Sequence, residues 1–557
     1  MKLLECVPNF SEGRRKEVID RIVEAIDSVE GITLLDVEPG AATNRTVVTF
    51  VGEPEAVVEA AFRGIKTAAE LIDMRQHKGE HPRIGAADVC PFVPVTGITI
   101  EEAVKLAHQL AKRVWEELKI PVYLYEYAAT CEERKKLENI REGQYEGLPQ
   151  KLKDPRWKPD YGEPVFNPKS GATVIGVRDF LIAYNINLNT KDRRLAHEIA
   201  LNIRERGRLK RDAQGNIVRD EHGNPIRVPG RLKAVKAVGW YIEEYGCAQV
   251  SINLTNYKIT PLYKVFETVC EEAQKLGLRV TGSEIVGLVP KEAIIETGKY
   301  FLRKQGKSAG YPEEELIEIA IKSLGLNEVA DFNPDEKIIE YRVLKKRGPL
   351  MEKKCWQFIN EVSMDTPTPG GGSVSALCGA LSSALTAMVG NLTCGKKGYE
   401  NVAEEISKLA EKAQELKDKC QKLVDEDTEA FNKVMDAMRL PKKTEEQKKY
   451  REEKIEEATK LATEVPLKVM KTAREILKVA KEIGEKGMKE AISDIGVASA
   501  CALTAAEGAY LNVLINLPNI KDEEFKKKVK DEADKILKEV RDEKEKLYNF
   551  CINNIQL

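Results

Sequence analysis

The alternation of apolar and polar positions changes character near residue 340. Before that point, short apolar runs alternate with longer stretches whose apolar residues recur at helical spacing. The sequence predicts helices at 53–74 and 100–118, each followed by a strand, at 88–95 and 121–127. Alternating elements of this kind indicate an α+β sandwich in which helices cover one face of a mixed sheet.

The same alternation restarts at FLIAYNINL (180–188), which predicts a second, similar sandwich. The segment 209–229 interrupts it with two turn signals, QGN and HGN. We expect an exposed hairpin insertion there, with His222 in solvent.

Strand patterns end after KKRGPL (345–350), and the rest of the chain is predicted to be an all-α bundle. One helix-packing stripe steps by three and four residues, through Ile406, Leu409, Ala413, Leu416, Cys420 and Leu423. A second comprises Phe525, Val529, Ala533, Ile536 and Val540. The stretch 491–517 is apolar nearly all round, so we expect it to be buried on all sides, partly by another subunit.

These patterns divide the chain into four segments. The predicted domains are 1–178 and 179–343, the two sandwich subdomains, and 351–557, the helical bundle; 344–350 is a linker. A chain of 557 residues is long enough for several such domains.

Composition excludes several classes of protein. Lys and Arg number 88 and Asp and Glu number 90, so there is no global positive field for nucleic acid. The 11 cysteines contain no CxxC pair and indicate reduced thiols in a cytoplasmic protein. The N-terminus lacks the long apolar run of a secretory signal.

The uncharged stretch 366–395 is long enough to span a bilayer, which leaves membrane association as a lesser alternative. It is rich in Ala, Ser and Gly and has no aromatic residue at either end. A buried helix that packs closely through small residues is the favoured interpretation, and no membrane partner is expected.

The densest polar cluster of the first half is HKGEH (77–81), which matches the H-x-x-E-H zinc pattern. That pattern requires a continuous helix, and a glycine within the cluster and a proline after it are unfavourable there. A plain surface loop is one alternative. A loop that holds His81 as an acid/base group near neutral pH is the favoured one.

Two further segments have loop compositions typical of ligand binding. DYGEPVFNPKSG (160–171) is either an ordinary connection or a loop that holds a flat or neutral ligand. PTPGGGS (367–373) precedes a helix and could bind an anion with backbone amides, or be a flexible entry with Ser373 as the cap. It lacks the ending of a P-loop.

An acidic residue falls on the packing stripe of the helical half. Continued beyond 423, the stripe reaches Asp427, whereas Asp425 and Glu426 lie off it. A carboxylate at a core position is costly unless it is paired or functional, and burial would raise its pKa. Asp427 is therefore either a buried acid satisfied by a hydroxyl or a lysine, or a general base. Asp494 is a weaker second candidate.

Long strings in both halves resemble known enzymes. LECVPNFSEG (4–13), LLDVEPGAATNRTVVTFVG (34–52), HKGEHPRIGAADVCPFVPV (77–95) and GATVIGVRDFLIAYNINL (171–188) are similar to glutamate formimidoyltransferase. TPGGGSVSA (368–376), LVDEDTEAF (423–431) and AYLNVLINL (509–517) are similar to formimidoyltetrahydrofolate cyclodeaminase. Their order resembles the bifunctional formimidoyltransferase-cyclodeaminase family.

This resemblance implies two linked reactions in histidine degradation. The first transfers a formimidoyl group between N-formimidoyl-L-glutamate and tetrahydrofolate. The second cyclises 5-formimidoyltetrahydrofolate to 5,10-methenyltetrahydrofolate and releases ammonia. It also implies a polyglutamylated folate co-substrate, no metal, and a ring-like homo-oligomer built from dimers.

The resemblance assigns the catalytic histidine to His81 and the cyclodeaminase acid to Asp427. It assigns folate contacts to the loop residues Gly162, Glu163, Pro164, Val165, Phe166, Asn167, Pro168, Lys169, Ser170 and Gly171. Two alternatives stay open: a transferase that acts mainly on 5-formyltetrahydrofolate and glutamate, and a helical half that is only an oligomerisation scaffold.

Overall fold

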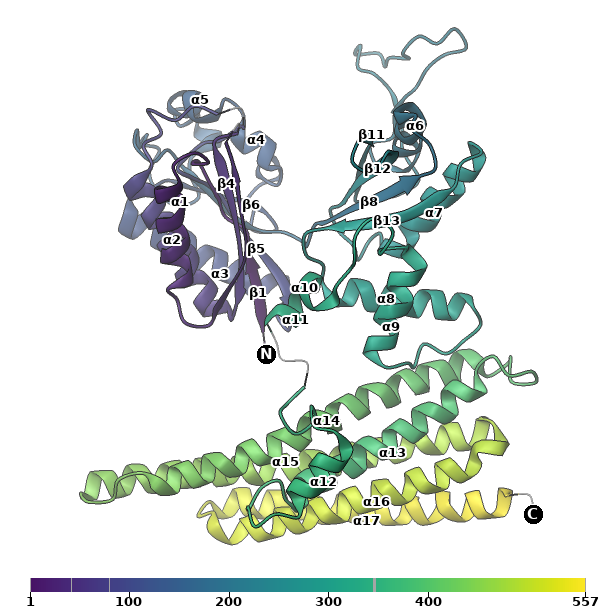
Figure 1. Ribbon diagram of the computed structural model, residues 1–557. Helices are drawn as coiled ribbons and strands as arrows, with labels where there is room; N and C mark the ends of the chain where they lie inside the picture. The colour runs from purple at the N-terminus through teal and green to yellow at the C-terminus, as the bar shows by residue number, and fades with distance from the viewer. Residues whose placement is uncertain (1, 42, 80, 344–346, 556–557) are drawn as a thin grey trace. The chain divides into compact units, whose positions relative to one another are not determined.

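The computed structural model describes residues 2–41, 43–79, 81–343 and 347–555 (Figure 1). The chain forms two compact units, Met1–Pro290 with Asp335–Val343, and Lys291–Pro334 with Leu344–Leu557. Strands lie in the first unit and the helical bundle lies in the second, which confirms the predicted order of α+β sandwiches followed by an all-α region.

The first sheet has seven strands in the order β1-β4-β2-β5-β7-β6, with β3 paired to β4. The pairs β5–β7 and β7–β6 are parallel and the others are antiparallel, so the sheet is mixed as predicted. Its strands are β1 (Leu3–Cys6), β2 (Asn9–Phe10), β3 (Ile32–Gly40), β4 (Arg45–Gly52), β5 (Ala87–Thr96), β6 (Val122–Glu126) and β7 (Thr173–Val177).

Three amphipathic helices cover one face of this sheet. They are α1 (Lys16–Asp27), α2 (Pro54–Leu71) and α3 (Ile100–Arg113). Their apolar sides and alternate strand residues such as Phe50 and Phe92 form one core. The short helices α4 (Leu137–Arg141) and α5 (Gln144–Lys151) pack on the opposite side chains of β6 and β7 in a smaller cluster.

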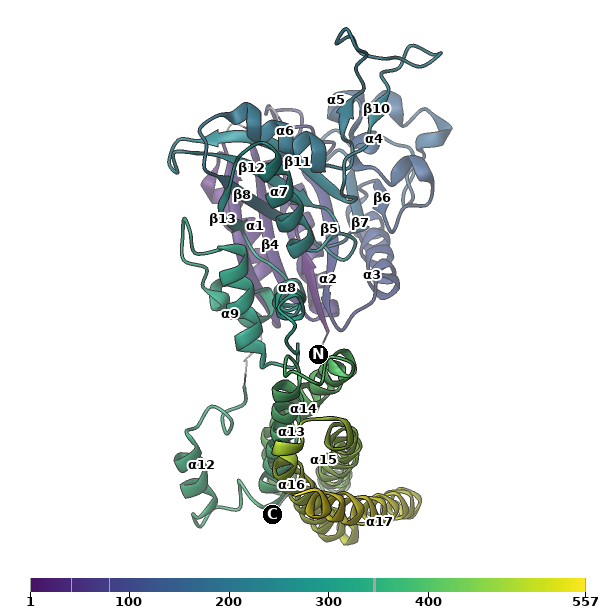
Figure 2. The same ribbon diagram turned by 90° about the vertical axis from the view of Figure 1, so that its right-hand side faces the viewer.

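The second sheet has four strands in the order β11-β12-β8-β13, and every pairing is antiparallel. The strands are β8 (Ile182–Leu188), β11 (Val235–Ile242), β12 (Cys247–Leu254) and β13 (Val280–Val286). Two helices, α6 (Arg193–Ile203) and α7 (Leu262–Lys275), pack against it, as Figure 2 shows.

The predicted insertion forms a projecting arm (Figure 1). The arm starts with the pair β9 (Arg208–Leu209) and β10 (Arg227–Val228). Beyond it are two similar turns, in which Asp212 and Asp220 accept backbone N–H bonds from the residues of their own turn. His222 is exposed there, as predicted.

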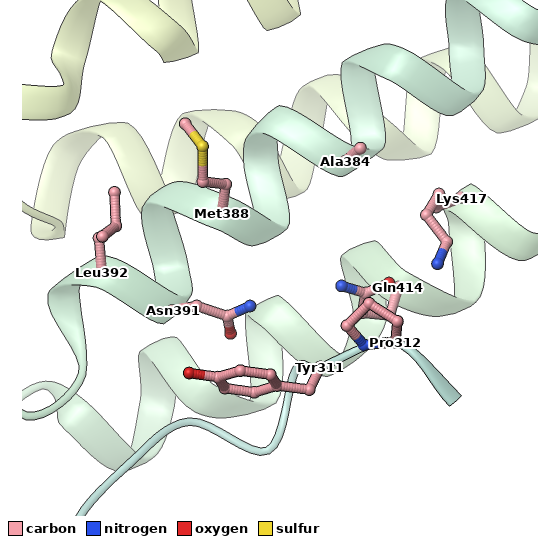
Figure 3. A pocket seen from close by; sticks show the side chains of 8 residues that line it. All are labelled: Tyr311, Pro312, Ala384, Met388, Asn391, Leu392, Gln414 and Lys417. Carbon is pink, nitrogen blue, oxygen red and sulfur yellow. The ribbon is translucent and has the colours of Figure 1, made fainter. Parts of the chain in front are cut away.

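Four shorter helices follow the second sheet: α8 (Lys291–Lys304), α9 (Glu313–Leu324), α10 (Pro334–Lys337) and α11 (Ile339–Val343). The first two belong to the second unit. The amides of Asn391 and Gln414 both donate to the Gly310 carbonyl, at 2.7 and 2.9 Å. These bonds border a hollow of about 360 Å³, in which the Tyr311 ring lies beside Asn391 (Figure 3).

The bundle is built from long helices. They are α13 (Gly371–Thr393), α14 (Ala403–Arg439), α15 (Glu445–Lys486), α16 (Ile492–Asn516) and α17 (Glu523–Asn554), and the short helix α12 (Cys355–Val362) precedes them. Most residues of the two predicted stripes are buried, and Leu409 and Phe525 are half-buried.

Small residues let α13 approach its neighbours closely. A Cβ atom on Gly379 would lie 2.8 Å from Cys420 Sγ on α14, and one on Gly390 would lie 2.9 Å from the Ala410 Cβ. On α16, a Cβ on Gly508 would lie 2.2 Å from Ser375 Oγ of α13. The predicted close packing through small residues is therefore present.

Two of the described helical segments, Gly371–Thr393 and Lys489–Asn519, are long and apolar enough to cross a membrane. The first is mostly buried by the bundle. The second contains α16, whose burial is predicted to come partly from this chain and partly from another subunit; within one chain it exposes Val497, Leu511 and Ile515 by 53, 65 and 71%. No other helix of the described chain covers this side of α16.

Candidate active sites

His81 lies in the connection between α2 and β5, which is held against the turn between β3 and β4. A Cβ on Gly79 would lie 2.2 Å from the Thr43 carbonyl oxygen, so the two backbones meet too closely for any side chain at 79. The Asn44 side-chain amide donates to the Lys78 carbonyl at 3.0 Å, and the His77 ring donates to the Asn44 carbonyl at 2.9 Å. These contacts fix the position of the histidine loop.

The hydrogen bonds of His81 define its tautomer. Its Nδ1 lies 2.7 Å from the Pro82 carbonyl, which can only accept, so Nδ1 carries the proton. Its Nε2 lies 2.9 Å from Nη1 of Arg45 and therefore accepts. Burial and the positive charges of Arg45 and Arg141 lower the pKa of His81 below its usual value. The result is a neutral imidazole that can act as a base.

His77 has a different environment from His81. Its Nδ1 accepts from Arg83 Nε at 3.1 Å, and Arg83 forms an ion pair with Glu146 at 2.7 Å. The two histidines therefore direct their nitrogen atoms to separate partners. Glu80 lies outside the described residues, and no group of three or more metal-binding side chains occurs among those that are described.

A cleft of about 1170 Å³ opens in the first unit between side chains of its two sandwiches. Seven cationic and four acidic side chains line it. The cationic ones are Arg45, Arg141, Arg178, Arg204, Arg206, Lys136 and Lys236, and the acidic ones are Glu126, Glu138, Asp179 and Glu205. An excess of positive charge suits a ligand with several carboxylates. Sequence patterns missed Arg45 and Arg141, although Arg45 is a lone charge at the start of an apolar strand.

His81 is not among the cleft-lining residues, but Arg45 is, and it joins the imidazole to the cleft. The same Nη1 of Arg45 also donates to Asn9 Oδ1 at 2.7 Å. Arg141 forms an ion pair with Asp88, so its charge is compensated. The sequence interpretation found the histidine of this site but not the guanidinium groups around it.

The predicted folate loop, Gly162–Gly171, lies against the histidine connection but does not line the cleft. Its end is tied down: Ala86 N donates to the Ser170 carbonyl at 2.9 Å, and Gly171 pairs with Gly85. Its middle is open, and Val165 is 61% exposed. The structure therefore brings only the carboxyl end of this loop close to the His81 segment.

In the helical unit, Asp427 is a residue of α14. Its side chain lies beside the N-terminus of α13. Ser373 Oγ lies 3.2 Å from Asp427 Oδ2 and 2.8 Å from the Val424 carbonyl oxygen, and its single proton is shared between these two acceptors. The Ser373 hydroxyl does not cap α13 as one sequence alternative held; the N-cap is Gly370, without a side-chain bond. Burial raises the pKa of Asp427, as expected, and hydrogen bonds from Ser373 partly oppose this.

Asp425 differs from the sequence expectation. It lies off the stripe, yet only 6% of it is exposed, because the linker covers it. Asp425 Oδ1 accepts from Leu350 N at 2.7 Å, and a Cβ on Gly348 would lie 2.2 Å from its carboxyl carbon. Asp425 therefore anchors the linker to α14. Helical periodicity could not show this because the covering segment is distant in sequence.

Asp494, the weaker candidate, lies far from Asp427. Asn512 of α16 lies beside Gly371, at the Asp427 end of α13. Asp494 precedes Asn512 by 18 positions on the same helix, which is about 27 Å at 1.5 Å per residue. The two carboxylates cannot belong to one site within a single chain.

The fold and the two sites together define a two-part protein: one unit with a histidine beside a cationic cleft, and one with a half-buried aspartate in a helical bundle. Three family models match it in order. They are the Formiminotransferase domain, N-terminal subdomain, at 3–178, the Formiminotransferase domain at 183–344, and Formiminotransferase-cyclodeaminase at 354–535.

Individual relatives agree with these matches. The chain is 44% identical over 544 residues to the formimidoyltransferase-cyclodeaminase of Rattus norvegicus, with 97% of each chain covered. It is 46% identical over 322 residues to the glutamate formimidoyltransferase of Thermoplasma acidophilum, covering 58% of this chain and 99% of the relative. It is 39% identical over 191 residues to the methenyltetrahydrofolate cyclohydrolase of Methylorubrum extorquens, covering 34% and 92%. The chain belongs to the formimidoyltransferase-cyclodeaminase family.

The contact between Gly372 and Asp427 generates a selective test. A Cβ on Gly372 would lie 2.1 Å from Asp427 Oδ1, so Gly372→Ala must displace the carboxylate. A misplacement of about 1 Å can cost about a hundredfold in rate, and we expect that loss in ammonia release by the helical unit. Formimidoyl transfer should be unchanged, because the first unit is untouched.

Gly371→Ala is the matched control, since its Cβ would meet only Asn512 Nδ2, at 3.3 Å. The two variants are compared by ammonia release from added 5-formimidoyltetrahydrofolate. Equal rates in both would show that the position of Asp427 does not matter for the reaction.

Proposed function

We propose that the chain is a bifunctional folate enzyme of histidine degradation. Its first unit transfers the formimidoyl group of N-formimidoyl-L-glutamate to tetrahydrofolate. Its helical unit then cyclises 5-formimidoyltetrahydrofolate to 5,10-methenyltetrahydrofolate and releases ammonia. The observation that carries this proposal is the match over 97% of the chain to a formimidoyltransferase-cyclodeaminase, with a distinct candidate site in each unit.

His81 is the proposed proton carrier of the transfer. N5 of tetrahydrofolate attacks the formimidoyl carbon, and its proton passes to the unprotonated Nε2 of the imidazole. The protonated His81 then gives this proton to the amine of the departing glutamate. A neutral histidine with a lowered pKa suits the first half of this sequence.

Asp427 is the proposed acid/base group of the cyclisation. N10 attacks the carbon of the protonated amidine and loses a proton, and transfer of that proton lets the former imino nitrogen leave as ammonia. A carboxyl group whose pKa is raised by burial can accept the N10 proton or deliver one to the leaving nitrogen near neutral pH. The hydrogen bonds from Ser373 orient the Asp427 carboxyl group toward the N-terminus of α13.

Tetrahydrofolate is the proposed co-substrate of both units, in its polyglutamylated form. The cationic excess of the cleft supports this finer assignment, because each added glutamate brings another carboxylate. The steps derived for His81 and Asp427 are proton transfers that accompany a displacement at carbon. None of these steps uses a metal.

The cyclohydrolase relative favours a second candidate for the helical unit, hydrolytic opening of the methenyl ring. Ring closure makes, and hydrolytic opening breaks, a bond between a folate nitrogen and the one-carbon unit. The two reactions differ in product: closure yields ammonia with a rise in methenyltetrahydrofolate absorbance, whereas hydrolysis lowers that absorbance without ammonia.

A cytoplasmic location is proposed from the cysteines. All 11 thiols of the chain are free, and even Cys6 and Cys90, whose sulfur atoms lie 3.5 Å apart, are not joined. This state suits a reducing compartment.

A homo-oligomer built from dimers is also proposed, with α16 at an interface between copies. Val497, Leu511 and Ile515 lie at spacings of fourteen and four, which places them on one side of the helix. They form an exposed apolar stripe that a second copy of this chain would cover.

Two variants should separate the activities. His81→Asn should lower formimidoyl transfer by ~10²–10⁴-fold and leave cyclisation of added 5-formimidoyltetrahydrofolate intact. Asp427→Asn should lower cyclisation of added 5-formimidoyltetrahydrofolate and leave formimidoyl transfer intact. The measurement is a coupled assay of methenyltetrahydrofolate absorbance and ammonia.

Glu426→Gln is the control for charge removal on α14. Glu426 is the neighbour of Asp427 in the chain and lies beyond the Ser373 contacts. If His81→Asn keeps transfer within about threefold of the wild type, proton transfer by this side chain is not worth the expected factor and the assignment is wrong.

The proposed tail specificity predicts tighter binding of longer folates. The KM of the transferase should fall from monoglutamyl to pentaglutamyl tetrahydrofolate, and the difference should shrink in salt, because screening weakens carboxylate–guanidinium attraction. Identical KM values at low salt would contradict a role of the cleft cations in holding the tail.

The proposed interface predicts a change of mass on charging the α16 stripe. Leu511→Glu with Ile515→Glu should reduce the particle size measured by light scattering, because buried unpaired carboxylates are costly. Lys538→Glu, on an exposed position of α17, is the control and should leave the mass unchanged. An unchanged mass in the double variant would place the interface elsewhere.

A further inference from the structure

We propose that Arg45 binds a carboxylate of the glutamyl substrate and thereby switches His81 into its proton-accepting state. The proposal rests on the transferase function proposed above and assigns the substrate contact that makes His81 responsive. It concerns a residue that neither periodicity nor motif singled out.

The geometry places Arg45 between the histidine and the cleft. Arg45 is the first residue of β4 and lines the cleft, whereas His81 does not. Nη1 of Arg45 donates to His81 Nε2 at 2.9 Å and to Asn9 Oδ1 at 2.7 Å. The lone pair that must accept the N5 proton is thus already occupied by an Arg45 N–H.

The charge of Arg45 is not compensated by a direct partner. Within the described chain, no carboxylate oxygen makes a hydrogen bond or ion pair with its guanidinium. Glu38 and Asp88 act on it only from farther away, and Arg141 opposes it. Asp88 is itself engaged with Arg141 and with Ile84 N. A half-buried cation without a counter-ion is costly unless a ligand supplies the anion.

A bound carboxylate would change the environment of His81 in two ways. It would compete for the Arg45 N–H groups and free the Nε2 lone pair. It would also neutralise the nearer of two positive charges that lower the pKa of His81. Among the described residues, the charged groups that face His81 are Arg45 on β4, Arg141 at the end of α4 and Asp88 on β5, and of these only Arg45 lacks a direct counter-ion.

The sign of the effect follows from Coulomb's law. Positive neighbours disfavour imidazolium, so neutralising Arg45 raises the pKa of His81 in the substrate complex above its value in the empty site. His81 is then most basic when the formimidoyl donor is present. The N5–C bond forms, the C–N bond to glutamate breaks, and the proton moves from N5 to Nε2 and on to the leaving amine. Departure of glutamate restores the Arg45–His81 bond.

The experiment measures proton uptake on ligand binding by the full-length protein. N-acetyl-L-glutamate has the two carboxylates of the substrate, no charged amine and no transferable formimidoyl group. Isothermal titration in buffers of different ionisation enthalpy, near pH ~6.5 where histidine titrates, gives the number of protons bound with it. The wild type should take up a fraction of a proton.

The variants assign that proton. His81→Asn should bind the ligand without proton uptake. Arg45→Gln should bind it at least about tenfold more weakly, the cost of roughly one charge-assisted hydrogen bond, and without uptake. Arg45→Lys, which keeps the charge and guards against misfolding of the first variant, should recover affinity but only part of the uptake, because an ammonium lacks the planar fork.

Arg206→Gln is the matched control. It removes a cation from the same cleft but makes no contact with His81, so it should weaken binding and leave the proton uptake in place. Uptake that persists in Arg45→Gln, or wild-type binding without uptake, would overturn the coupling alone. A wild type that neither binds the ligand nor transfers formimidoyl groups would overturn the proposed transferase function with it.

Kinetics gives a second readout. In the wild type the acidic limb of kcat, which reports the complex, should lie at higher pH than that of kcat/KM, which reports the free enzyme. In Arg45→Gln the two limbs should coincide. Separate limbs in that variant would exclude Arg45 as the switch.

Discussion

Both candidate sites lie where two segments of the chain approach each other more closely than a Cβ atom would allow. The three approaches are Gly79 to the Thr43 carbonyl oxygen, Gly85 to the Ala172 carbonyl oxygen, and Gly372 to the carboxylate of Asp427. A Cβ atom added to any of these glycines would lie only 2.1–2.2 Å from the opposing atom. The first two contacts hold the His81 connection between the β3–β4 turn and the start of β7. The third sets the carboxylate at the N-terminus of α13. These close approaches set the positions of both side chains.

The two sites hold titratable side chains in partly buried surroundings, which shift the pKa of the histidine down and that of the aspartate up. Around His81, burial and then the guanidinium groups of Arg45 and Arg141 lower the pKa of the imidazole and favour its neutral form. Around Asp427, burial favours the protonated carboxyl. Neither arrangement is one that stability alone would select, because isolated charges near a core are costly. Each pKa shift favours the uncharged form of its group.

The helical unit shows how small residues serve two purposes. They let α13 pack closely in the bundle, as at Gly379 and Gly390, and they leave room beside Asp427 at Gly372. As a consequence, α13 has little polar surface of its own. Its neighbour α16 is equally apolar, yet one side of it stays uncovered in a single chain.

Sequence by itself determined the order of two sandwiches and a bundle and the stripes of α14 and α17, and it singled out His81 and Asp427 as candidates. Periodicity and loop composition report on neighbours within one element, and these features depend on such neighbours. Arg45 and Arg141, the burial of Asp425 under Leu350 and the open side of α16 were decided by tertiary structure. Arg45 and His81 are 36 positions apart, and Asp425 and Leu350 are 75. Contacts at such separations leave no periodic trace in one sequence, because they arise only when distant segments pack together.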